Sequence, residues 1–262
     1  MVRAHVREPN IMFEKKNPIL VSMPRTGSTV IGKMLYNIAH HKFGSKNYLN
    51  QYTTMSPHYL EVFEKKDGLI QSVSYQREKN GFTKEYEQRA TTIRQRVQML
   101  VGDNKYTMKV FAHDFSPDMY NYFKSQYDFI FLERRDTVAQ LLSFATMMET
   151  NKHEFRSDDQ FGQSYFDFEN CLTFFGTLSQ YSRIKKATPN AKVICYEDFM
   201  QLGGDVAALQ QLLELPKEMI PETLKIDTVP TPYQSNLEDL LVNKEEWLLH
   251  KPTILKFLEA LQ

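Results

Sequence analysis

The sequence predicts an α/β protein: a three-layer sandwich in which helices cover both faces of a central, mostly parallel sheet. Short apolar runs alternate along the chain with stretches in which apolar residues recur every three or four positions, a pattern typical of parallel β-α-β units. The 262 residues are enough for one sizeable core. No repeat, low-complexity tract or long flexible linker divides the chain, so we expect residues 1–262 to form a single domain.

The first predicted strand is Ile19–Met23, and a tight loop over residues 24–28 connects it to a helix that begins near Thr29. Apolar residues of this helix recur with the spacing of a buried face: Val30, Ile31, Met34, Leu35 and Ile38. Residues 43–81, rich in Tyr, Ser and Asn, are expected to be less regular. Residues 83–101 are expected to form a helix with one apolar face.

Further along the chain the strand and helix signals are clearer. Three more strands are expected at Tyr106–Phe111, Tyr127–Glu133 and Ala191–Tyr196. One helix would start with Ser116 as its cap and Pro117 in its first position. Another would be capped by Asp136 and would bury Val138, Leu141, Leu142, Ala145 and Met148. The last three expected helices cover residues 165–187, 206–213 and 244–261.

Composition argues against several function classes. Lysine plus arginine equals aspartate plus glutamate at 32 each, which argues against broad binding to nucleic acid or acidic membranes. The two cysteines, Cys171 and Cys195, are too few for a disulfide framework and fit a reducing interior. No apolar run approaches the length of a membrane span, and the N-terminal residues lack the apolar core of a signal peptide. We therefore expect a soluble, cytoplasmic protein.

The loop after the first strand has the chemistry of an anion site. Backbone N–H groups at a helix N-terminus point outward without partners, and the helix dipole adds partial positive charge there. Gly27 would let the backbone approach a phosphate closely, and Arg25 would supply a fixed charge. Hydroxyl hydrogen bonds would come from Thr26, Ser28 and Thr29. The alternative is an ordinary strand–turn–helix connection with a Ser or Thr as N-cap.

A nucleoside-triphosphate loop fits the same residues less well. The run from Gly27 to Lys33 matches G-x-x-x-x-G-K, but Met34 stands where a Ser or Thr should coordinate magnesium. The first glycine should come just after the strand, whereas Gly27 comes four residues past Met23. We therefore expect Gly32 and Lys33 to lie inside the helix, with Lys33 in solvent.

Four polar features fall at or just past the C-terminal ends of predicted strands. They are the 24–29 loop, His113, the Arg134–Arg135 pair and the Tyr196–Asp198 run. In open parallel sheets, ligands bind at that edge. Each feature also has a structural interpretation: the arginines as solvated charges, His113 as a structural histidine, and Tyr196 as a core aromatic residue.

These landmarks resemble those of the sulfotransferases that use 3′-phosphoadenosine 5′-phosphosulfate (PAPS). The family's phosphosulfate loop reads Pro-Lys/Arg-Ser/Thr-Gly-Ser/Thr-Thr between a strand and a helix, and residues 24–29 match it at every position. Its 3′-phosphate signature is an arginine at a strand end and a serine eight residues later, as in Arg135 and Ser143. A third signature is a strand ending in Tyr-Glu-Asp, whose tyrosine approaches the adenine, as in Tyr196. The resemblance spans positions 19–199 in the family's order.

The resemblance implies a P-loop-like phosphosulfate-binding loop and transfer of a sulfuryl group from PAPS to a hydroxyl or amine, with release of 3′,5′-adenosine bisphosphate. Arg25 and the backbone of residues 27–29 would stabilise the negative charge that develops on the leaving oxygen. The implied contacts to PAPS come from Arg25, Thr26, Gly27, Ser28, Thr29, Arg135, Ser143 and Tyr196.

The acceptor must also lose a proton, which requires a base within hydrogen-bond reach. The family places a catalytic histidine near a lysine after the second strand, which suggests His113 as the base and Lys109 as an added positive charge. Three residues separate them here, where the cytosolic enzymes have one. Related bacterial enzymes use a glutamate after the first helix, but the comparable segment carries Gln51, which cannot act as a base. We place Gln51 and Tyr52 in the acceptor site, for a small-molecule, carbohydrate or lipid acceptor.

Val30 stands where many cytosolic members have Trp, so the chain looks more like the bacterial or viral branch. Two other functions stay open. A magnesium-dependent nucleotide kinase would need the hydroxyl that is missing at Met34, and a non-catalytic nucleotide-binding or scaffold protein would keep the fold without a base. Neither an H-E-x-x-H nor a C-x-x-C motif occurs, and we expect no metal site.

Overall fold

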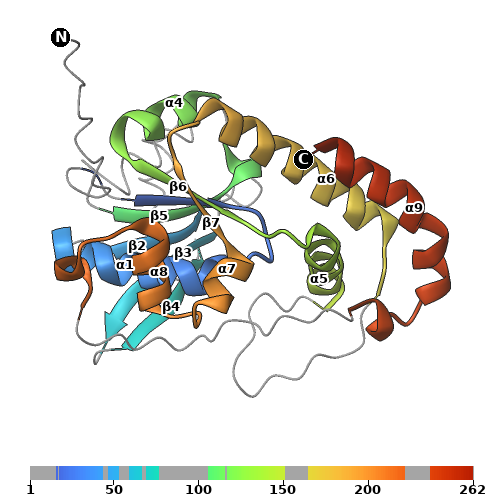
Figure 1. Cartoon of the computed structure of the whole chain (residues 1–262), viewed down its shortest axis with the longest axis horizontal. Coiled ribbons are helices and arrows are strands. Elements are labelled where there is room, and N and C mark those ends of the chain that lie inside the picture. Colours follow the sequence, from blue (N-terminus) through green and yellow to red (C-terminus); the bar gives the residue numbers. More distant parts are fainter. Residues whose placement is uncertain are drawn as a thin grey trace, which may run out of the picture.

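A seven-stranded sheet forms the middle of the described part of the chain (Figure 1). This computed structural model describes residues 16, 18–43, 47–52, 59–66, 69–76, 106–115, 117–150, 165–221 and 237–261. The strands are β1 (Pro18–Ser22), β2 (Asn47–Tyr52), β3 (Tyr59–Lys66), β4 (Leu69–Gln76), β5 (Tyr106–Phe111), β6 (Asp128–Glu133) and β7 (Lys192–Cys195). Their order across the sheet is β4-β3-β2-β5-β1-β6-β7.

The centre of the sheet is parallel. Strand β1 pairs in parallel with β5 on one side and β6 on the other, and β7 continues the parallel arrangement beyond β6. Strand β2 joins β5, also in parallel, whereas β3 and β4 form an antiparallel extension at the edge. The α/β class with a mostly parallel sheet is therefore confirmed, and the C-terminal ends of five strands meet at one edge.

Helices cover both faces of this sheet. They are α1 (Ser28–Phe43), α4 (Pro117–Gln126), α5 (Thr137–Thr150), α6 (Phe168–Ala187), α7 (Tyr196–Gln201), α8 (Val206–Leu213) and α9 (Lys244–Leu261). Helices α1, α7 and α8 lie below the strands in Figure 1, and α4 and α6 lie above them. No helix in the described ranges is long and apolar enough to cross a membrane.

Strand residues alternate between the two layers, because successive side chains of a strand point to opposite faces. Ile19 and Val21 belong to a buried cluster with residues of α4, α5, α6 and α9. Leu20, between them, belongs to a second cluster with residues of α1, α7 and α8. The sheet is thus apolar on both faces, as expected for a parallel sheet covered on both sides.

The prediction that residues 43–81 are less regular is wrong, because this region holds β2, β3 and β4. A sequence signal for part of it exists, since Asp67-Gly68 stands between β3 and β4 and is a typical two-residue hairpin sequence. The predicted helix over residues 83–101 lies outside the described residues.

Helix α5 differs from its predicted buried face at two positions, Val138, which is only partly buried, and Met148. Asp136 caps it as predicted, since its Oδ1 accepts a hydrogen bond from the N–H of Ala139 at 2.8 Å. Met148, predicted to be buried, is 48% exposed, because it lies in the last turn of the helix. Phe144 is buried in the cluster that α5 shares with α6.

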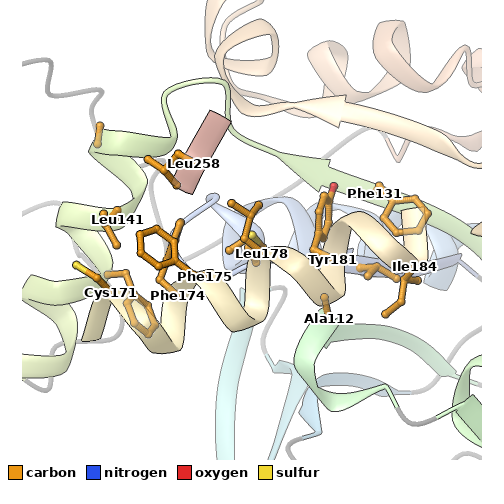
Figure 2. Close-up of a cluster of buried hydrophobic side chains, with 14 of the residues drawn as sticks. Ala112, Phe131, Leu141, Cys171, Phe174, Phe175, Leu178, Tyr181, Ile184 and Leu258 are labelled. Carbon is orange, nitrogen blue, oxygen red and sulfur yellow. The ribbon is translucent and has the colours of Figure 1, made fainter. Parts of the chain in front are cut away.

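Helix α6 supplies the most aromatic part of the core. Figure 2 shows its buried side chains against Phe131 of β6, Leu141 of α5 and Leu258 of α9. The buried residues of α6 are Cys171, Phe174, Phe175, Thr177, Leu178, Tyr181 and Ile184. The ring of Tyr181 meets that of Phe131 edge to face, with the centroids 5.6 Å apart.

Replacing Tyr181 by phenylalanine should leave the fold intact or stabilise it. The Tyr181 hydroxyl is buried and has no hydrogen-bond partner in the described part of the chain. An unsatisfied buried hydroxyl costs about 1–3 kcal/mol, and Tyr181→Phe removes it while keeping the ring against Phe131. Urea unfolding should give an unchanged or higher free energy of unfolding. A loss above about 1 kcal/mol would show that the hydroxyl is bonded after all.

Candidate functional site

The loop between β1 and α1 has an unusual backbone. Arg25 and Gly27 both have positive φ angles, of 63° and 74°, and Thr26 between them does not. The Thr26 hydroxyl donates to the carbonyl of Met23 at 2.8 Å, and the Gly27 carbonyl accepts the N–H of Ile31 at 3.2 Å. Left-handed residues at such a turn gather backbone N–H groups into an anion-binding concavity, here at a helix N-terminus.

Side chains from the neighbouring β6–α5 connection and from α5 hold this loop in place. Gln140 donates from Nε2 to the Pro24 carbonyl at 2.7 Å, and Arg134 donates from Nη1 to the Arg25 carbonyl at 3.4 Å. The Arg25 side chain donates from Nε to Ser143 Oγ at 3.0 Å. A left-handed non-glycine residue costs about 1–2 kcal/mol, and these contacts fix Arg25 in that conformation.

Tyr196 packs directly against the loop. It was predicted to end a strand, but β7 ends at Cys195 and Tyr196 begins α7. A Cβ atom on Gly27 would lie 2.4 Å from Tyr196 Cε2, so only glycine fits beneath this ring. The tyrosine is 3% exposed, and its burial raises its pKa to about 12. The ring therefore supports the loop; its predicted approach to an adenine stays a prediction.

The two arginines at the end of β6 have different surroundings. The side chain of Arg134 is 9% exposed, and its guanidinium lies over the Tyr196 ring, 5.8 Å from the centroid. The side chain of Arg135 is 61% exposed and pairs with Asp198 at 2.5 Å. Ser143, predicted to share a phosphate with Arg135, accepts its described hydrogen bond from Arg25. The structure thus brings Arg134, which was not among the predicted site residues, to the loop.

Glu197 ties this arginine pair to the start of α7. Its carboxylate accepts the backbone N–H of Arg135 at 3.1 Å and that of Asp136 at 3.2 Å. Burial alone would raise the pKa of Glu197, but hydrogen bonds from the Cys195 thiol and from these N–H groups outweigh it and lower the pKa. Glu197 is therefore ionised at neutral pH and stabilises the connection between β6 and α5.

Lys109 lies within β5 and His113 comes just after it, and β5 is the neighbour of β1 on the side opposite β6. Lys109 is buried, and its Nζ lies 3.4 Å from Thr29 Oγ1 and over the Phe111 ring. His113 lies in the short helix η1 (Ala112–Asp114) and stacks on Phe111 with the centroids 5.7 Å apart. Burial lowers the pKa of His113, which keeps the imidazole in the neutral form that accepts a proton. His113 thus lies just past the C-terminal end of β5, and the Lys109 side chain reaches the first turn of α1.

The lowered pKa of His113 should make the stability of the fold depend on pH. The unfolded histidine has a pKa of about 6.5 and the folded one a lower pKa, so the unfolded state binds a proton first as the pH falls. Stability should therefore drop below about pH 6.5 in the wild type, until the folded histidine is also protonated. Urea midpoints at about pH 7.5 and about pH 5.5 should differ less in His113→Gln than in the wild type. If the midpoints differ between the two pH values as much in the variant as in the wild type, the pKa of His113 is not lowered in the folded state.

The prediction that Lys33 lies in solvent is wrong, because this residue is 0% exposed. Helix α1 contacts β1, β2, β5 and the short helix η2 (Lys217–Met219), so its polar face is covered as well as its apolar one. Lys33 lies one turn after Thr29 on the same side of the helix, and Thr29 is the residue that Lys109 contacts. The apolar pattern of α1 alone does not reveal that its opposite face is buried.

The predicted acceptor residues are placed only by their backbone. Gln51 and Tyr52 form the C-terminal end of β2, and their side chains lie outside the described part of the structure. Gln51 pairs with Glu61 of β3, after a register shift that follows Leu49. Because β2 runs parallel to β5, its end lies at the same edge of the sheet as His113. Their acceptor role stays a prediction.

A cavity of about 560 Å³ lies beside the loop, between β6, α5 and the C-terminal half of α6. Its wall includes Thr26 of the loop together with Arg134 and Arg135. Two lysines of α6, Lys185 and Lys186, add further positive charge, of which Lys185 pairs with Glu133. Lysines are common in the last turn of a helix, so the sequence gives no sign that these two line a cavity.

Comparison with known proteins adds no further assignment. No known family model matches the chain, and no curated protein matches it. Within the described ranges, no group of three or more His, Cys, Asp or Glu residues is placed to hold a metal ion. The loop, its supporting side chains and the resemblance of its sequence are therefore the features that indicate a function.

Proposed function

We propose that this protein transfers a sulfuryl group from PAPS to an acceptor hydroxyl or amine. The observation that carries the proposal is the loop of residues 24–28. Its sequence matches the phosphosulfate motif, and its backbone has left-handed residues at Arg25 and Gly27 directly before a helix N-terminus. Three cationic side chains lie at this loop: its own Arg25, and Arg134 and Lys109 from neighbouring segments. An anionic donor group fits this set of N–H groups and charges.

PAPS supplies an activated sulfuryl group bonded to its 5′-phosphate. In the proposed reaction the sulfur–oxygen bond to that phosphate breaks, and a bond from sulfur to the acceptor atom forms. Arg25 and the N–H groups of the loop stabilise the charge that grows on the leaving phosphate oxygen. His113 takes the acceptor proton, since its lowered pKa keeps it neutral. Lys109, beside Thr29, adds positive charge on the acceptor side.

The position of α1 favours PAPS over a nucleoside triphosphate bound with magnesium. The helix begins at Ser28, so Gly32 and Lys33 belong to its second turn and not to a phosphate-wrapping loop. Met34, the next residue, has no oxygen with which to coordinate magnesium. A kinase of the usual loop type would need Gly32 and Lys33 in the phosphate-wrapping loop and a hydroxyl at position 34.

The test is calorimetric titration with 3′,5′-adenosine bisphosphate and with ATP, each with and without magnesium. The proposal predicts metal-independent binding of the bisphosphate and weaker binding of ATP. In Arg135→Ala the bisphosphate affinity should fall about 10- to 100-fold, the usual effect of losing a hydrogen bond to a charged group. Arg183→Ala removes an exposed cation of α6 and serves as the control.

Each result has a distinct meaning. Preference for ATP with magnesium would replace the proposal with a kinase, and binding of neither nucleotide would favour a non-catalytic protein. Binding of the bisphosphate that Arg135→Ala leaves unchanged would keep the proposed reaction and overturn the assignment of the 3′-phosphate to Arg135.

A further inference from the structure

We infer that Arg134 and Gln140 are positioning residues, which hold two peptide groups of the loop so that the N–H groups of Arg25 and Thr26 face the anion. The inference rests on the proposed function and assigns the side chains that prepare its site. The sequence places Arg134 at the ligand-binding edge of the sheet without assigning it a contact, and it does not single out Gln140; neither residue belongs to the phosphosulfate motif itself.

Two consecutive carbonyls of the loop face the same neighbouring segment. The Pro24 carbonyl accepts from Gln140 Nε2 at 2.7 Å, and the Arg25 carbonyl accepts from Arg134 Nη1 at 3.4 Å. Both donors belong to the same neighbouring segment, the end of β6 and the start of α5. These two side chains therefore hold consecutive carbonyls of the loop on the side of that segment.

The planarity of the peptide group fixes the direction of the N–H groups as well. In a trans peptide the C=O and the N–H of one group point in opposite directions, and no peptide of the described residues is cis. The Pro24 carbonyl shares a peptide group with the Arg25 N–H, and the Arg25 carbonyl shares one with the Thr26 N–H. Fixing both carbonyls on Gln140 and Arg134 therefore directs both N–H groups away from those side chains.

Arg134 is itself held in place. Its side chain is 9% exposed, its guanidinium lies over the Tyr196 ring, and its Nε is 3.9 Å from Glu197 Oε1. A planar guanidinium can stack on a ring and donate in its own plane at the same time, which an ammonium group cannot do. Gln140 is likewise buried. Rigid supports of this kind remove the cost of reorganising the donors when the anion binds.

The experiment compares variants that preserve charge or shape but remove the directed hydrogen bond. Arg134→Lys keeps the positive charge and loses the planar donor, and Gln140→Met keeps a neutral side chain of similar length and loses the N–H donor. The matched control is Arg183→Lys, at an exposed arginine of α6 that has no role in the proposed site. For each, we would measure bisphosphate affinity by calorimetry, the melting temperature, and the amide ¹⁵N–¹H shifts of Arg25 and Thr26 during titration with the bisphosphate.

The expected result is a loss of affinity of roughly tenfold or more in Arg134→Lys and Gln140→Met, with unchanged affinity in Arg183→Lys. In the wild type the Arg25 and Thr26 amides should shift on binding, and in the two variants these shifts should shrink. If the wild type binds the bisphosphate but its two amides do not shift, or if both variants bind as the wild type does, the inference is wrong and the proposed function stands. A wild type that does not bind the bisphosphate overturns the proposed function and with it the inference.

Discussion

Arg25→Ala should slow sulfuryl transfer about 10²- to 10³-fold, the usual effect of removing one preorganised group that stabilises transition-state charge. Arg25 is held by Ser143 at one side and belongs to the loop that the leaving group would contact. Alanine at φ 63° carries the same left-handed strain as arginine, so the substitution should leave the fold stable. The rate is measured as release of inorganic sulfate from PAPS, a transfer to water that needs no other acceptor.

Two further variants separate charge from geometry at this position. Arg25→Lys keeps a cation but lacks the Nε donor that contacts Ser143, so its rate should lie between those of the wild type and Arg25→Ala. Arg183→Ala removes a cation of α6 that is exposed to solvent, and its rate should equal that of the wild type. Near-normal release of sulfate by Arg25→Ala would exclude Arg25 from the mechanism.

The parts of the site that could be predicted are those encoded by short contiguous patterns. The run 24–29 identifies a strand, a tight loop and a helix, and the structure has β1, the loop and α1 in these places. Helices α8 and α9 also have their predicted bounds. The meeting of strand ends at one edge also followed from sequence, since it depends only on the parallel order of the strands.

The supporting side chains could not be predicted, because they depend on contacts between distant segments. The spacing to Ser143 selects Arg135, yet Arg134 is the arginine that contacts the loop, 109 positions away along the chain. Gln140 reaches the Pro24 carbonyl across 116 positions, and no pattern marks it among the polar residues of α5. Lys33 is similar: its burial depends on what covers the second face of α1. These are consequences of packing, which a single sequence does not display.

Gly27→Ala should remove anion binding and destabilise the fold by about 2–5 kcal/mol. Two costs combine: a left-handed alanine costs about 1–2 kcal/mol, and overpacking costs about 1–3 kcal/mol. The new Cβ would lie 2.4 Å from Tyr196 Cε2 and 2.7 Å from Cδ2, so the ring or the loop must move. Tyr196 is buried beneath Arg134, which leaves the ring little room. Urea unfolding measures the loss of stability, and calorimetry with the bisphosphate measures the loss of binding.

The chain offers a matched control at Gly203, which has φ 108° and no atom within 4 Å of an added Cβ. Alanine there is strained by the backbone alone, at an angle at least as unfavourable as that of Gly27. Gly203→Ala should therefore lose less stability than Gly27→Ala and should keep its affinity for the bisphosphate. Because the backbone strain at Gly203 is at least as large, the difference between the two variants is a lower limit on the contribution of the Tyr196 contact. If Gly27→Ala loses no more stability than Gly203→Ala, the Tyr196 ring moves aside at little cost, and Tyr196 does not fix the shape of the loop.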